Sequence, residues 1–201
     1  MRYSFLKLTC AAALSSMVIA NISSAWGADI SFPKDQNCVA WKTKKTMFLV
    51  KSEEPVGINC SITITVDSPA AGTKQVLVKM PIEKFDSGEV DRDKEVLLLL
   101  KADKQKELEF LSKEIPEAQW PDYRTGKMSV LQGTLKIAGE SYPVDVQLKK
   151  SDDTAQAMLS GSLETTFTAF KIPPPNVAGG LVARVKDTLT LVFQLNPASL
   201  Q

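Results

Sequence analysis

Few residues in this 201-residue chain are of types that carry catalysis, because the sequence contains no histidine. Histidine is the usual general base and the commonest metal ligand, so Ser-His-Asp and Cys-His arrangements are excluded. Paired carboxylates occur at Asp91 with Asp93 and at Asp152 with Asp153, in segments that we expect to be exposed to solvent. Glycine-rich nucleotide-binding motifs are also absent from the sequence. We therefore predict no catalytic residue, no metal site and no cofactor, and we favour a binding protein over an enzyme.

The first 27 residues have the layout of a cleaved secretory signal peptide. Basic residues precede a short apolar core, and the small residues Ala25 and Gly27 stand where a cut after Gly27 requires them. An uncleaved membrane anchor is the alternative, but polar residues interrupt the core before it reaches the roughly 20 apolar residues of a spanning helix. We expect a periplasmic or secreted protein in which residues 28–201 form one domain without a transmembrane segment.

The charge balance argues against a nucleic-acid partner. The first 27 residues hold two of the 24 basic residues and none of the 23 acidic ones, so the mature chain carries a net charge of −1. A near-neutral chain with interspersed charges produces no long-range field that would attract nucleic acid or anionic lipid. The sequence does not fix the oligomeric state, and a homodimer stays open.

Two cysteines, Cys38 and Cys60, remain after removal of the signal peptide. Exported cysteines in an even number are more often paired than free, so we predict a disulfide between them. It would close a loop of about 22 residues and contribute roughly 3 kcal/mol to stability by loop-entropy arguments. The alternative is two buried thiols. A zinc site is disfavoured, because two sulfurs without histidine do not complete a tetrahedral ligand set.

Alternation of apolar and polar residues dominates the mature chain and predicts a mainly β fold. Residues 61–66 alternate strictly, Val76, Val78 and Met80 share one face, and Val144, Val146 and Leu148 are separated by polar residues. The turn signal at residues 138–141, between two such strands, predicts a hairpin. One dry and one wet face per strand is typical of antiparallel sheets with a single buried side. We expect eight strands, near residues 45–51, 57–66, 74–82, 106–114, 127–137, 142–150, 155–169 and 184–196. Eight antiparallel strands can close into a barrel just wide enough for side chains or one slender ligand, and a two-sheet sandwich is the alternative.

One segment departs from the strand pattern and predicts a short helix near residues 87–100. Asp86 could act as the N-cap, with Glu89 reaching back as in a capping box. Helical spacing places Val90, Leu97 and either Leu98 or Leu100 on one side, which suits a lid over one end of a barrel. A buried strand over residues 96–100 is the competing interpretation.

Several short motifs stand in an order that is similar to that of a known family. Residues 85–93 (FDSGEVDRD) are similar to the family's helix start, S-[LF]-D-T-G-x-x-x-R-D. Residues 133–139 (GTLKIAG) followed by Pro143-Val144 are similar to its G-x-L-T-I-x-G-x-x-x-P-V hairpin. Residues 185–191 (VKDTLTL) are close to its final strand, V-x-D-x-V-x-[IL], and Val56-Gly57 loosely resembles an early V-x-G-x-F strand. In this order the motifs resemble the YceI family of exported lipocalin-like barrels, and the resemblance covers nearly the whole mature chain.

The chain looks like a divergent member of that family. Residues 98–103 lack the aromatic residues and the Tyr-Pro of the family's F-F-D-x-x-x-Y-P segment, and residues 168–173 replace its R-x-D-F-G. The resemblance implies a barrel that binds a long isoprenoid chain, such as a polyisoprenoid or a quinone tail. Burial of an apolar chain needs no catalytic residue, only a dry lumen of matching width.

We predict an exported protein that holds an isoprenoid or other amphiphilic lipid in its lumen for transport or storage. The alternative is a structural or interaction barrel whose own side chains fill the lumen and whose partner is a protein. Arg92 would either hold the ligand's headgroup or pair with Asp93. The candidate lumen residues, each of which could instead be ordinary core, are Ile64, Val78, Leu135, Val146, Leu163, Leu191 and Phe193.

Overall fold

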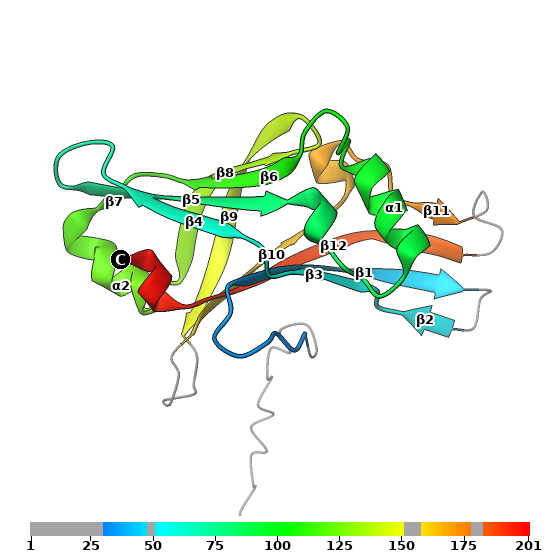
Figure 1. Cartoon of the computed structure of the whole chain (residues 1–201), viewed down its shortest axis with the longest axis horizontal. Coiled ribbons are helices and arrows are strands. Elements are labelled where there is room, and N and C mark those ends of the chain that lie inside the picture. The colour runs from blue at the N-terminus through cyan, green and yellow to red at the C-terminus, as the bar shows by residue number, and fades with distance from the viewer. Residues whose placement is uncertain (1–29, 48–50, 151–157, 178–182) are drawn as a thin grey trace, which may run out of the picture.

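The computed structural model describes residues 30–47, 51–150, 158–177 and 183–201 (Figure 1). The predicted signal peptide and the pair Asp152 and Asp153 lie outside these residues. The strands are β1 (Cys38–Met47), β2 (Lys51–Glu53), β3 (Val56–Asn59), β4 (Thr63–Asp67), β5 (Thr73–Pro81), β6 (Glu107–Ser112), β7 (Ile115–Pro116), β8 (Val130–Ile137), β9 (Glu140–Lys150), β10 (Leu159–Thr165), β11 (Asn176–Val177) and β12 (Ala183–Leu195). The α-helices are α1 (Val90–Leu99) and α2 (Trp120–Arg124).

The strands form one antiparallel sheet that folds back on itself. Its order is β2-β1-β12-β10-β9-β8-β6-β5-β4, with β3 paired to β1 and β11 to β12. In Figure 1 the strands β4, β5, β6 and β8 lie above β1, β3 and β12, and α1 and α2 lie at opposite ends. The predicted apolar face of β5 is confirmed, since Val76, Val78 and Met80 are all buried. The mainly β, antiparallel architecture is therefore confirmed.

The predicted eight strands and the closed barrel are not confirmed. The described residues hold twelve strands, some of only two or three residues. Among the described residues no ladder joins β3 or β2 to β4, so hydrogen bonding does not close the sheet into a ring. The single helix predicted near residues 87–100 is present as α1, and α2 is an additional short helix.

The predicted strand over residues 57–66 is broken into β3 and β4 by Asn59. The Asn59 side chain is fully buried; its Nδ2 donates to the Pro81 carbonyl at 2.8 Å, and its Oδ1 accepts from the Ser61 N–H at 2.8 Å. The hydrogen bond from the Ser61 N–H to Asn59 replaces a ladder bond, and the chain turns here from one layer to the other. Strict alternation continues through the turn, so the pattern alone gives no sign of it.

The segment before α1 pairs with β3, an end strand of the sheet. The N–H of Ile58 donates to the Asp86 carbonyl and the N–H of Asp86 donates to the Ile58 carbonyl, both at 2.9 Å. The neighbouring Phe85 side chain is buried. This short bridge fixes the start of α1 against the sheet.

Strand β1 begins seven residues before the predicted strand at 45–51. Val39 and Trp41 point to the interior, and the opposite face of the strand carries Cys38, Ala40 and Lys42, which are also buried. Because both faces are covered, β1 lacks the wet-dry alternation that marks the other strands. Residues 48–50 of the predicted strand lie outside the described part of the chain.

The hairpin between β8 and β9 follows from its turn residues. Ala138 and Gly139 both have positive φ, 53° and 90°, as a two-residue hairpin turn matched to the sheet's twist requires. The register runs from Ile137 with Glu140 to Val130 with Gln147.

Cys38 and Cys60 form a disulfide with a sequence separation of 22 residues. It joins the start of β1 to the turn between β3 and β4. The bond thereby holds the segment that links the two layers.

Replacing both cysteines by serine should lower the free energy of unfolding by about 3 kcal/mol, because the unfolded chain regains the entropy of an open loop. Urea denaturation of both proteins measures the difference. Dithiothreitol should shift the wild-type midpoint to that of the double variant and leave the variant unchanged. Equal midpoints for oxidised and reduced wild type would contradict this role.

Candidate functional site

An apolar cavity lies between α1 and the strands. We call it the outer cavity; its volume is about 260 Å³. Its wall from the sheet includes Trp41, Leu189 and Leu191, and the loop after β10 contributes Phe167 and Ile172. All of these are apolar or aromatic side chains, so the cavity offers a dry surface to a ligand.

A second cavity, the middle cavity, lies deeper between the two layers and has a volume of about 90 Å³. Only apolar residue types line it, among them Val78, Leu135, Leu163, Leu191 and Phe193. A third, the inner cavity, has a volume of about 30 Å³ and lies against Trp120 of α2.

The three cavities form a row. The outer and middle cavities share Leu191, and the middle and inner cavities share Val76, Leu131, Phe193 and Leu195. The row therefore runs from the α1 end of the molecule to the α2 end, which are opposite ends in Figure 1. An extended apolar chain is the ligand shape that such a row fits.

The structure brings most of the predicted lumen residues to one place. Six of the seven line the middle cavity, namely Val78, Leu135, Val146, Leu163, Leu191 and Phe193. Ile64 packs against the core, opposite Val78 on β5, but lines none of the cavities described. Arg92 lies at the outer cavity. Whether these side chains contact a ligand is taken up as a proposal below.

Helix α1 covers the outer cavity without being buried itself. Val96, Leu99 and Leu100 line the cavity, and no residue of the helix is fully buried. The predicted inward face was wrong for Val90, which is 71% exposed. Of the two alternatives Leu98 and Leu100, Leu100 lines the cavity and Leu98 is 80% exposed. A helix held by so few buried side chains belongs to the low-stability end of the structure, where lids are found.

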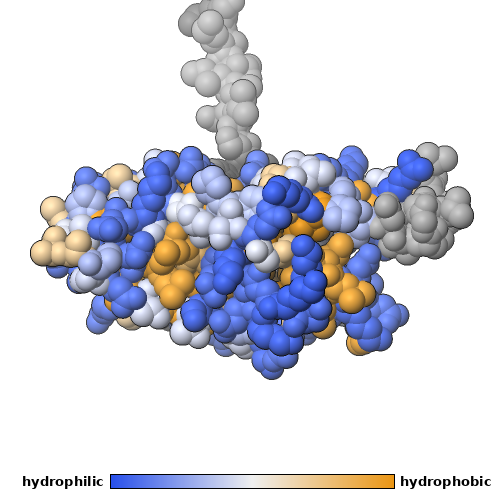
Figure 2. Space-filling model, turned by 90° about the horizontal axis from the view of Figure 1, so that it is seen from above, coloured by the Kyte–Doolittle hydropathy of each residue, from blue (hydrophilic) through white to orange (hydrophobic). Residues whose placement is uncertain are grey.

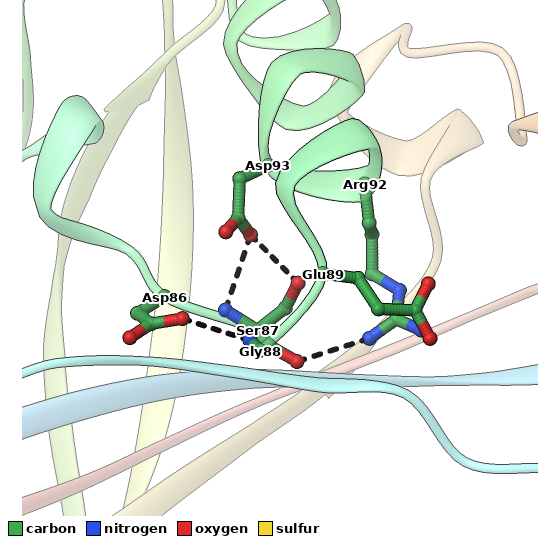
Figure 3. A network of polar contacts seen from close by, with 6 residues as sticks. All are labelled: Asp86, Ser87, Gly88, Glu89, Arg92 and Asp93. Carbon is green, nitrogen blue, oxygen red and sulfur yellow. Dashed lines mark hydrogen bonds and ion pairs between the residues drawn. The ribbon is translucent and has the colours of Figure 1, made fainter.

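The start of α1 is held by a polar network that differs from the predicted capping box (Figure 3). Asp86 accepts from the Gly88 N–H at 2.8 Å and does not cap the helix. Asp93, inside the helix, instead holds the segment that precedes it. One of its carboxylate oxygens accepts from the Ser87 N–H at 3.1 Å and from the Ser87 hydroxyl at 2.6 Å.

Arg92 is engaged within the same network. Its guanidinium lies 2.6 Å from the Glu89 carboxylate and donates to the Ser87 carbonyl at 3.2 Å. The predicted alternative of a pair with Asp93 is wrong, because Asp93 bonds to Ser87 instead. The side chains of Arg92 and Glu89 point toward each other in Figure 3.

The polar rim of the outer cavity carries more acidic than basic groups. Glu89, Asp91 and Glu95 line it together with Arg92 and Lys45. Since Glu89 already neutralises Arg92, an anionic group could pair with Arg92 only by displacing this carboxylate. The excess of acidic groups at the rim therefore favours an uncharged group over an anionic one.

Aromatic rings in the lumen lie over glycines of neighbouring strands, a feature that the sequence analysis missed. Trp41 lies opposite Gly57 in the register of β1 and β3, and a Cβ on Gly57 would collide with the indole ring. Phe193 covers Gly161 in the same way. The only signal in the sequence is an isolated glycine within each strand pattern, and the pairing becomes visible once the register is known.

The loop after β10, which carries Phe167 and Ile172 into the outer cavity, is fastened by polar contacts. Asp187 on β12 accepts from the Thr168 N–H at 3.0 Å and from the Thr168 hydroxyl at 2.5 Å. The hydrogen bond from the Thr168 side chain, more than any other cause, lowers the pKa of Asp187 below its ordinary value of 3.8. The aspartate of the motif at residues 185–191 thus has a structural role here.

A second set of contacts ties this loop to the β8–β9 hairpin. The Tyr142 hydroxyl donates to the Phe170 carbonyl at 2.9 Å, and the two rings meet edge to face with centroids 5.2 Å apart. Lys171 lies 2.6 Å from Glu140. The hydrogen bond from Lys171 lowers the pKa of the Glu140 carboxyl.

The described residues hold no group of three potential metal ligands. Their helices include none that is both long and apolar enough to cross a bilayer. On the face drawn in Figure 2, hydrophobic residues appear in separate patches between hydrophilic ones. Asp91, one of the paired carboxylates, is 97% exposed at its side chain.

Comparisons with known proteins agree with the fold. A model described as the YceI-like domain matches residues 38–196, and a search of curated proteins found no match. The crystal structure of Burkholderia cenocepacia BcnA is similar with a TM-score of 0.55 and 16% identity, covering 78% of this chain and 94% of that one. A polyisoprenoid binding domain from Saccharophagus degradans, implicated in plant cell wall breakdown, is similar with a TM-score of 0.57 and 12% identity, covering 80% and 95%. At these identities the structural likeness shows a shared fold.

Replacing Asp93 by alanine should loosen the start of α1, because Ser87 loses both of its hydrogen bonds to Asp93; the loss of such hydrogen bonds costs about 1 kcal/mol. Hydrogen exchange of the amides in residues 87–93 should accelerate. The exposed Asp91→Ala serves as the control and should leave these rates unchanged. Equal rates in all three proteins would rule out this role of Asp93.

Replacing Asp187 by asparagine should reduce stability at neutral pH and have less effect in acid. A carboxyl whose pKa is lowered by folding contributes stability above its unfolded pKa and loses it as the pH falls through its folded pKa. The difference in melting temperature between wild type and variant should therefore shrink as the pH falls below 3.8. Thr168→Val should give the same pH profile, and a difference that does not vary with pH would contradict the assignment.

Proposed function

Because this chain belongs to the YceI-like domain family, we propose that it binds an isoprenoid-like or other amphiphilic chain in its row of apolar cavities. The observation that carries this proposal is the row itself, which leads from the outer cavity beneath α1 to the middle cavity between the layers. At about 260 Å³ the outer cavity alone is close to the lower limit of ligand pockets, about 300 Å³.

Binding of an apolar chain at this site is driven by removal of its surface from water. Each Å² of apolar surface buried contributes roughly 25 cal/mol, and the apolar walls demand no hydrogen bond in return. The slender shape of the row favours a flexible, linear chain over a compact ring system. Two findings support a lipid-binding function: the chain belongs to the YceI-like domain family, and its fold is similar to that of a polyisoprenoid binding domain.

The headgroup is placed by this proposal at the rim, among Glu89, Glu95 and Arg92. Since Arg92 is paired with Glu89 at 2.6 Å, the rim suits an uncharged polar headgroup, such as an alcohol or a quinone. In this proposal Arg92 positions Glu89 and Ser87 at the rim. It contacts the ligand through the part of its side chain that faces the cavity.

The role of the protein in the cell follows from the predicted signal peptide. An exported protein that shields an apolar chain from water would carry or store that chain outside the cytoplasm. The site works by binding alone. The candidate residues Val78, Leu135 and Leu163 enclose the chain without reacting with it.

The competing function is a structural barrel with a self-filled lumen and a protein partner. The small volume of the middle cavity, about 90 Å³, is the observation in its favour. The two functions differ in whether the lumen takes up an added chain.

The first test measures the binding of an isoprenoid alcohol such as farnesol. Quenching of Trp fluorescence is the readout, because Trp41 lines the outer cavity. Leu99→Asp should weaken binding about tenfold or more, since the ligand would bury an unpaired charge. Leu98→Asp is the matched control: it places the same charge on the same helix, at a side chain that is 80% exposed, and should bind like wild type.

Mass spectrometry of an organic extract of the purified mature protein provides a second readout. A co-purifying isoprenoid or other amphiphile is expected in stoichiometric amounts. The absence of any lipid, together with no quenching by added isoprenoids, would count against carriage and in favour of the self-filled barrel.

A further inference from the structure

The lumen narrows in two steps, and an inward-facing residue of β12 lies at each step. Leu191 lines both the outer and the middle cavity, and Phe193 lines both the middle and the inner cavity. The volumes fall from about 260 to about 90 and then to about 30 Å³. A linear chain that enters beneath α1 must therefore pass Leu191 and would end against Phe193.

The ring of Phe193 occupies the space that a side chain at Gly161, on the neighbouring strand β10, would fill. Gly161 pairs directly with Phe193, and a Cβ at Gly161 would come within 3.0 Å of its ring. The ring of Phe110 covers Gly133 in the same way, with a Cβ at Gly133 falling 2.6 Å from the ring. Both rings line the middle cavity and lie against the neighbouring strands, which leaves the remaining space in the lumen unfilled.

We propose that the middle cavity selects ligands by chain length, with Leu163 and Leu191 forming its opening and Phe193 its end. The inference rests on the proposed function. A short isoprenoid is held by the outer cavity alone. A longer one gains affinity only by placing its tail beyond Leu191, and each methylene buried there strengthens binding roughly fourfold.

Leu163 is the position at which this inference is tested most cleanly. It pairs with Leu191 across β10 and β12 and lines the middle cavity but not the outer one. Leu163→Phe should fill the middle cavity and leave the outer cavity as it is. Substituting Gly161 would be a poorer test, because a Cβ there would also lie 2.6 Å from the Gln147 carbonyl oxygen and force the backbone to move.

The matched control is Leu111→Phe, the same substitution on β6. Leu111 is 41% exposed and lines none of the cavities described. Both variants and the wild type are titrated with geraniol, farnesol and geranylgeraniol, three isoprenoid alcohols of increasing length, and thermal denaturation checks that each variant is folded.

The affinity of the wild type should rise along this series. For Leu163→Phe, geraniol should bind within about twofold of wild type, whereas geranylgeraniol should bind about tenfold more weakly or worse. Leu111→Phe should match the wild type at every length. The inference is overturned if Leu163→Phe weakens all three alcohols equally or weakens none of them.

Phe193→Leu provides an independent check that does not depend on filling the lumen. The smaller side chain should join the middle cavity to the inner one and strengthen geranylgeraniol binding by about threefold or more relative to geraniol. Unchanged or weaker relative binding of the longer alcohol would remove Phe193 as the end of the site. Failure of the proposed function looks different, because the wild type would then bind none of the alcohols.

Discussion

The structure depends on one constraint: the inward faces of its strands must be apolar and dry although side chains do not fill the space between them. Voids in a protein interior forfeit packing, at a cost of about 24 cal/mol per Å³, so the middle cavity alone costs roughly 2 kcal/mol. The rings of Phe110 and Phe193 create this space by lying over glycines instead of reaching across the lumen. A bound apolar chain would restore the missing contacts, which links the stability of the protein to its occupancy.

The surrounding elements close the two ends of this interior differently. The turn at Asn59 and the disulfide between Cys38 and Cys60 hold the connection between the two layers. The end at the inner cavity is packed by Trp120 and Leu200, both buried. At the other end α1 covers the outer cavity without a fully buried residue, and its start is fixed by the bridge between Asp86 and Ile58.

The fold could be predicted from the sequence where one face of an element is wet. Alternation identified the buried face of β5, and the turn residues Ala138 and Gly139 identified the β8–β9 hairpin. Alternation failed at β1, where Lys42 and its neighbours on the outer face are buried as well. It also failed at Asn59, because a hydrogen bond that the buried Asn59 side-chain oxygen accepts ends a strand without changing the apolar pattern. Closure of the sheet depends on pairings between distant segments, and local patterns do not encode these.

The residues that line the cavities could be predicted on the strands but not on α1. Inward-facing residues of well-patterned strands, such as Val78 and Leu163, were found because strand parity fixes their direction. The inward face of α1 was predicted poorly, since a run of four leucines gives no clear helical face, and Leu98 proved to be exposed. The glycines opposite aromatic rings required the strand register.

The most direct measurement is an isotope-filtered solution NMR experiment on the isotope-labelled mature protein mixed with unlabelled geranylgeraniol. The account predicts intermolecular Overhauser contacts from the isoprenoid methyl groups to the methyl groups of Leu191 and Leu163. Contacts confined to exposed side chains such as Leu98, or no contacts at all, would contradict it.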